Sequence, residues 1–147
     1  MSQFLFDTNI FNKILDEKID LSKLSNKDCY VTHVQSDEIL ATKNQNRRLM
    51  LEEIFLQVSS KQIPTESFVI GVSRLNKAKL GDGVRYGQLL QRLNQLNNAK
   101  PNNVKDALIA EAALANNIIL VTEDRDLAKV MNEFGGSVFR MQDFLSA

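Results

Sequence analysis

Cysteine and histidine are almost absent from this sequence, which limits the metal and redox sites it can build. Its 147 residues include one cysteine, Cys29, and one histidine, His33. A single cysteine cannot form an internal disulfide, and the two residues cannot make a Cys2His2 zinc site. We therefore expect Cys29 to be a small buried hydrophobe in a strand and His33 to make local hydrogen bonds at a helix start.

Long apolar runs are also missing. No stretch approaches the roughly 18 apolar residues of a membrane span, and the first residues lack the basic and apolar segments of a signal peptide. Together with the single cysteine, these absences favour a cytoplasmic protein. Hydrophobic residues make up 44% of the chain and charged residues 24%, which is typical of a globular protein. The length suits one domain covering residues 1–147.

An excess of positive charge is lacking too, because 18 Lys and Arg residues balance 18 Asp and Glu residues. This excludes a uniformly cationic nucleic-acid binder. The charges are unevenly distributed, however: residues 74–105 hold seven bases and one acid, and residues 106–147 hold seven acids and three bases. The basic stretch could attract phosphates or form a solvated helix face. Its candidate substrate-binding residues are Lys79, Arg85 and Arg92.

Short β-rich runs alternate with helical patterns along the chain. The predicted strands are residues 4–6, 29–31, 118–121 and 138–140, with an extended or edge segment near 63–64. The run 118–121 is predicted to be central, because it is continuous and β-branched. Apolar spacing predicts helices after each of these strands and at 51–58 and 86–96. The alternation predicts a three-layer α/β/α sandwich with a mainly parallel sheet.

Helix boundaries are marked by several polar residues. Thr32 and Gln35 have the spacing of a capping box, and Asn103 is predicted to cap the helix that carries Ile109. The least regular segment, residues 71–83, could still hold a short helix supported by Val72, Leu75 and Leu80.

Four acids are predicted to lie at the carboxyl ends of the strands, where open parallel sheets bind ligands. Asp7 directly follows the first strand, and Asp124 follows residues 118–121 by three positions. Glu38 lies in the second turn of the helix after the second strand, and Asp106 in the first turn of the helix leading back to 118–121. Each acid alone has an ordinary interpretation: a helix cap for Asp7, Asp106 and Asp124, and a solvated residue for Glu38.

Taken together, the four acids favour a metal site. Carboxylates that converge on one cleft raise one another's pKa unless a cation neutralises them. Because the ligands would be oxygens only, Mg²⁺ or Mn²⁺ is the expected ion.

The sequence resembles the PIN-domain nucleases, particularly the small single-domain VapC-like toxins, over nearly its whole length. The segments that carry the resemblance are residues 4–9 (FLFDTN), 37–40 (DEIL), 106–110 (DALIA) and 120–127 (LVTEDRDL). The resemblance implies a metal-binding and catalytic quartet of Asp7, Glu38, Asp106 and Asp124. It also implies supporting roles for Asn9, Thr122 and Asp126.

The activity implied by the resemblance is Mg²⁺- or Mn²⁺-dependent hydrolysis of RNA phosphodiester bonds by an activated water. The enzyme would be the toxin of a toxin-antitoxin pair, with an antitoxin protein as partner, or a stand-alone relative, and a homodimer is expected. Glu38 could act through a second metal or as a base.

Two other functions remain open from the sequence. One is a non-catalytic PIN-like module that binds RNA or a protein. The other is a receiver-like or phosphohydrolase domain with Asp7 as acceptor or nucleophile. The latter is disfavoured because Asn9 replaces a second acid and no clear lysine follows a late strand.

Overall fold

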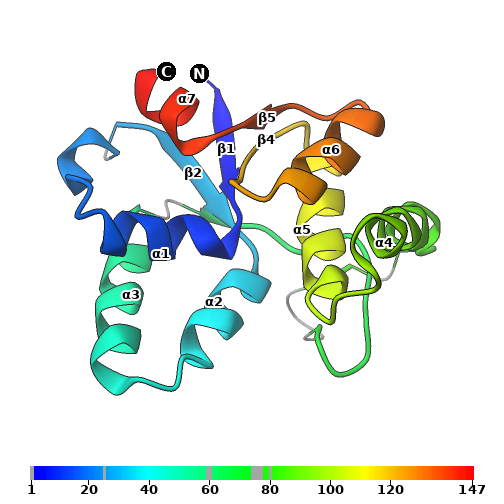
Figure 1. Ribbon diagram of the computed structural model, residues 1–147, viewed down its shortest axis with the longest axis horizontal. Coiled ribbons are helices and arrows are strands. Elements are labelled where there is room, and N and C mark those ends of the chain that lie inside the picture. Colours follow the sequence, from blue (N-terminus) through cyan, green and yellow to red (C-terminus); the bar gives the residue numbers. More distant parts are fainter. Residues whose placement is uncertain (1, 25, 59–60, 74–77, 80) are drawn as a thin grey trace.

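The protein is built around a five-stranded parallel sheet, seen in the computed structural model of Figure 1. The structure describes residues 2–24, 26–58, 61–73, 78–79 and 81–147, and every statement below concerns these residues. The strands are β1 (Gln3–Phe6), β2 (Asp28–Val31), β3 (Lys61–Gln62), β4 (Ile119–Val121) and β5 (Val138–Phe139). Their order across the sheet is β3-β2-β1-β4-β5, and all neighbouring pairs are parallel.

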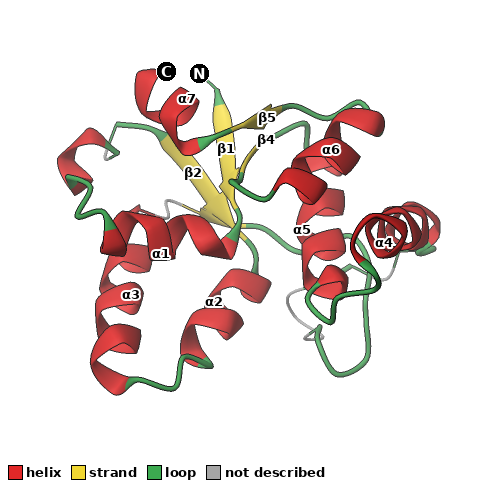
Figure 2. Cartoon of the chain, in the orientation of Figure 1, coloured by secondary structure: helices red, strands yellow, loops and turns green. Residues whose placement is uncertain are grey.

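Helices cover both faces of the sheet, as Figure 2 shows. In the described residues they are α1 (Thr8–Asp16), α2 (His33–Leu40), α3 (Gln45–Val58), α4 (Val84–Asn97), α5 (Asn103–Ala115), α6 (Arg125–Glu133) and α7 (Met141–Ser146), with a 3-10 turn at Leu21–Lys23. The predicted three-layer α/β/α sandwich with a mainly parallel sheet is confirmed. None of the described helices is long and apolar enough to cross a membrane.

The two faces of the sheet bury separate cores, because successive strand residues point in opposite directions. Leu5, Tyr30 and Leu120 pack with α4, α5 and α6. Phe6 and Val121 point the other way, toward α1, α3 and α7. Phe6 packs edge to face against Phe11 and Phe144, with ring centroids 5.5 and 5.0 Å apart. The last residue of β1 is therefore anchored to α1 and α7 by apolar packing.

Three local expectations need correction. The strand at 118–121 lies inside the sheet as β4, but β1 is the middle strand because it pairs with both β2 and β4. Asn103 does not cap α5: it is the first helical residue, and its side chain bonds instead to Asn94 and Asn97 on α4. The described part of residues 71–83 contains no helix, and Leu75 and Leu80 lie outside the described residues.

Other local expectations are confirmed. Cys29 is buried in β2, and the capping box of Thr32 and Gln35 opens α2. His33 is an exception: it is the first residue of α2 as expected, but in the described part of the chain its Nε2 atom contacts the distant Val72 carbonyl oxygen at 3.3 Å and its Nδ1 atom has no hydrogen-bond partner. The extended segment near residues 63–64 directly follows edge strand β3.

The chain reverses its direction of travel across the sheet next to β1. It runs from β1 outward to β2 and β3, then returns to the other side of β1 to form β4 and β5. At such a switch point the loops that leave two adjacent strands diverge and open a crevice at their carboxyl ends. The corresponding position in this sheet follows Phe6 and Val121, which are register partners, and we call the region around it the crevice.

A buried glutamine joins this crevice to α2. Gln35 is fully buried, and its Nε2 atom donates to the carbonyl oxygen of Phe6 at 2.7 Å. Its Oε1 atom accepts from the backbone N–H and the hydroxyl of Thr32 at 2.9 and 2.6 Å. One side chain therefore fixes the end of β1 relative to the start of α2, and so positions Asp7 relative to Glu38.

Replacing this glutamine tests its contribution to stability. We expect Gln35→Met to lower the free energy of unfolding by about 3 kcal/mol, because the Phe6 carbonyl and the Thr32 N–H lose buried partners. Urea denaturation measures the change. The control Gln45→Met, at an exposed position, is expected to change stability by less than about 0.5 kcal/mol. Equal effects of the two variants would contradict this role for Gln35.

Candidate metal site

Asp7 directly follows β1 at this switch point. Pairing of β1 with β4 continues beyond the strands, since the Asp7 N–H donates to the Val121 carbonyl at 3.0 Å. Asp7 is 3% exposed, and its Oδ2 atom accepts a hydrogen bond of 2.9 Å from the Thr122 hydroxyl. Although Asp7 occupies the N-cap position of α1, its side chain makes no capping bond. The helix-cap interpretation therefore does not explain this carboxylate.

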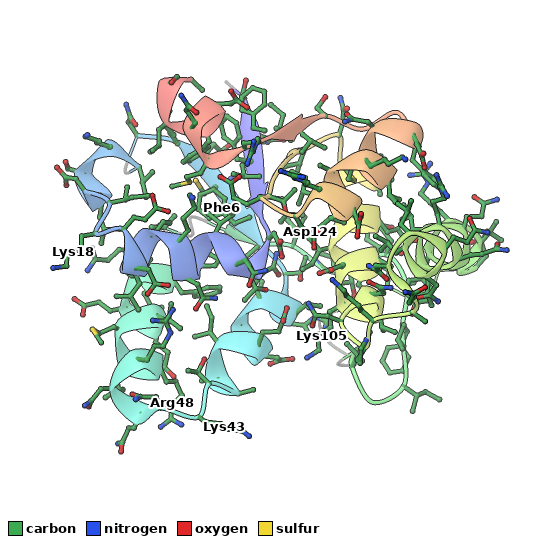
Figure 3. The ribbon with its side chains drawn as sticks, in the orientation of Figure 1. Phe6, Lys18, Lys43, Arg48, Lys105 and Asp124 are labelled. Carbon is green, nitrogen blue, oxygen red and sulfur yellow. The ribbon has the colours of Figure 1, made fainter. Side chains whose placement is uncertain are left out.

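Thr122 links two of the candidate acids. Its hydroxyl donates to Asp7 and accepts from the backbone N–H of Asp124 at 3.0 Å. Asp124 in turn caps α6, because its Oδ1 atom accepts from the N–H groups of Asp126 and Leu127 at 2.9 and 3.1 Å. Asp124 is thus a helix cap through one carboxylate oxygen, which leaves the other oxygen for a second role. Figure 3 shows Asp124 near the middle of the molecule, where α6 begins.

Glu38 and Asp106 approach from the two flanking helices. The Thr8 hydroxyl, in the first turn of α1, donates to Glu38 Oε1 at 2.7 Å and so holds α2 against α1 at the crevice. Asp106 lies in the first turn of α5 and is 7% exposed. The Asn102 amide is 3.5 Å from its Oδ1 atom, which is a weak hydrogen bond.

The four acids interact electrostatically. The pKa of Asp7 is raised to about 6: burial is the largest cause, the hydrogen bond from Thr122 lowers it, and the charges of Glu38 and Asp124 raise it. The pKa of Asp106 is raised to about 8, mainly by burial and then by the charges of Asp7, Asp124 and Glu38. Such mutual repulsion is what a bound cation relieves.

All four candidate ligands are carboxylates, and their oxygen atoms are the ligands that a hard divalent cation prefers. The side chains as they stand do not form a ready cage: among the described residues, no three acidic, histidine or cysteine side chains are grouped closely enough to hold a metal ion. Metal binding would therefore require the carboxylates to approach one another.

The three predicted supporting residues differ in their placement. Thr122 is buried and bonded to Asp7. Asp126 contributes only a backbone N–H, which supports Asp124. Asn9 is exposed, and in the described part of the chain no hydrogen bond joins it to the acids.

The structure does not bring the predicted substrate-binding residues to the crevice. Lys79 pairs with Glu66 at 3.1 Å. Arg85 lines a separate cavity of about 390 Å³ that reaches Ala115, at the end of α5 opposite Asp106. Arg92 forms two hydrogen bonds, of 2.8 and 3.1 Å, with Glu133 at the far end of α6. Their roles as substrate contacts stay predictions.

Two structural residues of the site were not predicted from the sequence. Thr8 holds Glu38, and Gln35 holds the end of β1. The Thr32-x-x-Gln35 spacing marks a capping box, but nothing in it reveals the second bond of Gln35 to Phe6, 29 residues away. Thr8 follows Asp7 directly, so its place in the opening motif was the only available signal.

The raised pKa values predict how stability depends on pH without metal. An acid with a pKa near 3.8 when unfolded and about 6 or 8 when folded binds more protons in the folded state between these values. The free energy of unfolding should therefore fall as pH rises from about 4 to about 8.

Removing the carboxylate of Asp106 should make the stability of the protein less dependent on pH. We expect Asp106→Asn to raise the melting temperature at pH 8 in EDTA by about 5 °C or more, and to have little effect near pH 4. The control Glu53→Gln, at an exposed position, should leave the slope unchanged. Thermal melts across this pH range measure both. A wild-type stability that rises toward pH 8 would contradict the electrostatic description.

Comparisons with known proteins support the fold. No protein-family model matches the sequence, and a search of curated proteins finds no match. Among solved structures, PAE2754 from Pyrobaculum aerophilum is similar at 12% identity, with a TM-score of 0.57 over 99% of this chain and 93% of that chain. FitAcB from Neisseria gonorrhoeae matches at 14% identity and a TM-score of 0.48, covering 92% and 96%. VapBC-5 from Mycobacterium tuberculosis is a member of the VapBC family of toxin-antitoxin systems. It matches at 18% identity with a TM-score of 0.47, over 95% of this chain and 98% of that chain. The chain thus shares its overall fold with PAE2754.

Proposed function

We propose that this protein is a Mg²⁺- or Mn²⁺-dependent ribonuclease that hydrolyses RNA phosphodiester bonds. The observation that carries the proposal is the coupling of four carboxylates at the β1/β4 switch point, two of which have strongly raised pKa values. The residues proposed to hold the metal are Asp7, Glu38, Asp106 and Asp124. A bound divalent cation would supply a water of lowered pKa and stabilise charge on the leaving oxygen.

The chain's own residues prepare this chemistry by fixing the carboxylates. Thr122 orients Asp7 through its hydroxyl and simultaneously sets the turn that carries Asp124. Thr8 keeps one oxygen of Glu38 occupied, which leaves the other for a metal or a water. Asp106 is desolvated by its position on α5, so its ionised form gains most from a nearby cation.

The resemblance to VapC-like proteins extends the proposal to a biological setting. The protein would act as a toxin paired with an antitoxin protein, or as a stand-alone relative, and would form a homodimer. These are proposals about partners, and each can be tested separately from the chemistry.

A second candidate is a non-catalytic module that binds RNA or a protein. The observation favouring it is that no three described acidic side chains are already grouped around a metal position. The two functions differ in their response to Mg²⁺, because only the enzyme requires the cation for turnover.

The ribonuclease proposal predicts a strong effect at Asp7. In Asp7→Asn, Mg²⁺-dependent cleavage of a labelled RNA should fall by more than about 100-fold, because loss of a direct ligand exceeds the usual effect of removing a supporting residue. Circular dichroism should show an intact fold. Unchanged cleavage in this variant would indicate a contaminating nuclease and contradict the proposal.

The hydroxyl of Thr122 provides a finer test. We expect Thr122→Val to reduce cleavage by about 10- to 100-fold through misorientation of Asp7, while Thr122→Ser retains most activity because its hydroxyl can make the same bonds. Initial rates at saturating Mg²⁺ measure both variants. Similar losses of cleavage rate in Thr122→Val and Thr122→Ser would show that the Thr122 hydroxyl does not orient Asp7.

A further inference from the structure

A surface groove begins at the candidate metal site and follows α6. Thr122 and Asp124 line its start, and Glu133 lines its far end, in a volume of about 480 Å³. Ligand pockets in proteins are typically about 300–1,000 Å³, so the groove can hold one small organic unit. We call it the α6 groove. Thr122 and Asp124 belong to the candidate site as well, so a molecule in the groove would lie beside Asp124, one of the four acids.

Ion pairs neutralise most of the charges along the α6 groove. Arg140 donates to Glu123 at 2.9 Å. Glu133 is held by Arg92, which reaches across from α4. Its pKa is lowered first by the hydrogen bond from Arg92 and less by the charge of Lys129. Both acid-base pairs therefore contribute little net charge to the groove.

Two cations remain without such partners. Arg125 and Lys129 line the groove, are exposed, and form no ion pair with another described residue. They lie four positions apart on α6 and so project from the same face of the helix. The carboxylate of Asp124, which accepts a hydrogen bond from the start of α6, offsets their charge in part. The groove thus presents two available cations next to the proposed site of phosphodiester hydrolysis.

We propose that the α6 groove binds the nucleotide next to the scissile bond of a single-stranded RNA, with Arg125 and Lys129 contacting its phosphate. This rests on the proposed ribonuclease function. The volume of the groove, about 480 Å³, suits one nucleotide unit, and its pair of cations complements the phosphate backbone. Arg92 is a positioning residue here: it neutralises Glu133, which would otherwise repel the phosphate at the far end.

Salt-dependent binding tests the two cations. A short fluorescein-labelled single-stranded RNA of mixed sequence is titrated with protein in EDTA, which prevents metal-dependent cleavage, and anisotropy gives the affinity. We expect Arg125→Gln/Lys129→Gln to weaken binding and to reduce the slope of log affinity against log salt concentration by about 0.7, the value for one neutralised phosphate of a single strand.

The matched control is Lys18→Gln/Lys23→Gln, which removes the same charge from exposed positions. Figure 3 shows Lys18 on the opposite side of the molecule from the α4–α6 layer. The control should leave affinity and slope nearly unchanged. Equal losses of RNA affinity in the two double variants would overturn the proposal, because binding would then depend only on the total charge of the protein.

A second pair of variants separates positioning by Arg92 from direct contact. We expect Arg92→Gln to weaken RNA binding and Arg92→Gln/Glu133→Gln to restore it, because the second change removes the released charge of Glu133. If Arg92 itself contacts phosphate, affinity stays low in the double variant, which would overturn its positioning role.

Cleavage assays distinguish failure of this inference from failure of the proposed function. If the wild-type protein cleaves RNA with Mg²⁺ and the Arg125→Gln/Lys129→Gln variant shows an unchanged KM, the groove assignment fails and the ribonuclease remains. If the wild-type protein cleaves no RNA under any metal condition, the proposed function itself fails, whatever the binding data show.

Discussion

The parallel pairing of β1 with β4 is the constraint on which the candidate site depends. It makes Phe6 and Val121 register partners, so the residues that follow both strands emerge side by side. The backbone bond from Asp7 to Val121 extends the pairing by one residue. Because both strands are buried on two faces, neither can shift its register without exposing its apolar side chains. Asp7 and Thr122 are therefore held in contact by the cores rather than by the loops.

The apolar packing on both faces of the sheet explains how the protein can bury carboxylates that repel one another. An isolated buried charge is costly, and the raised pKa values of Asp7 and Asp106 express that cost. The helices that carry Glu38, Asp106 and Asp124 are packed onto the sheet through apolar residues, which offsets the local penalty. The crevice is consequently a destabilised region within a stable frame, as is common at functional sites.

Much of the fold followed from the sequence because the strands are short, apolar and spaced by helices. Asp7 and Asp124 could be placed at strand ends for the same reason, since a position after a strand is a local property. Contacts between distant helices could not be predicted in this way. The bonds of Asn103 to α4 and of Arg92 to Glu133 depend on how α4 packs, which no local pattern specifies.

The placement of charged residues shows the same contrast between local sequence patterns and contacts between distant helices. The excess of bases in residues 74–105 is real, but the structure commits Lys79 and Arg92 to ion pairs with acids. Arg125 and Lys129, which line the α6 groove and form no ion pair with another described residue, lie in the acidic C-terminal part, where counting charges by segment hides them. The charge count of a segment indicated that the protein could attract phosphate. The packing of α4 against α6 indicates the place, the α6 groove.

The central claim is that the four carboxylates form one divalent-cation site. Anomalous diffraction from a crystal soaked in Mn²⁺ tests it most directly, because the ion's position is observed independently of any activity. The account predicts an anomalous peak within coordination distance of Asp7 and Asp106, with Glu38 and Asp124 drawn toward it. A crystal at saturating Mn²⁺ with no peak among these side chains would contradict the account.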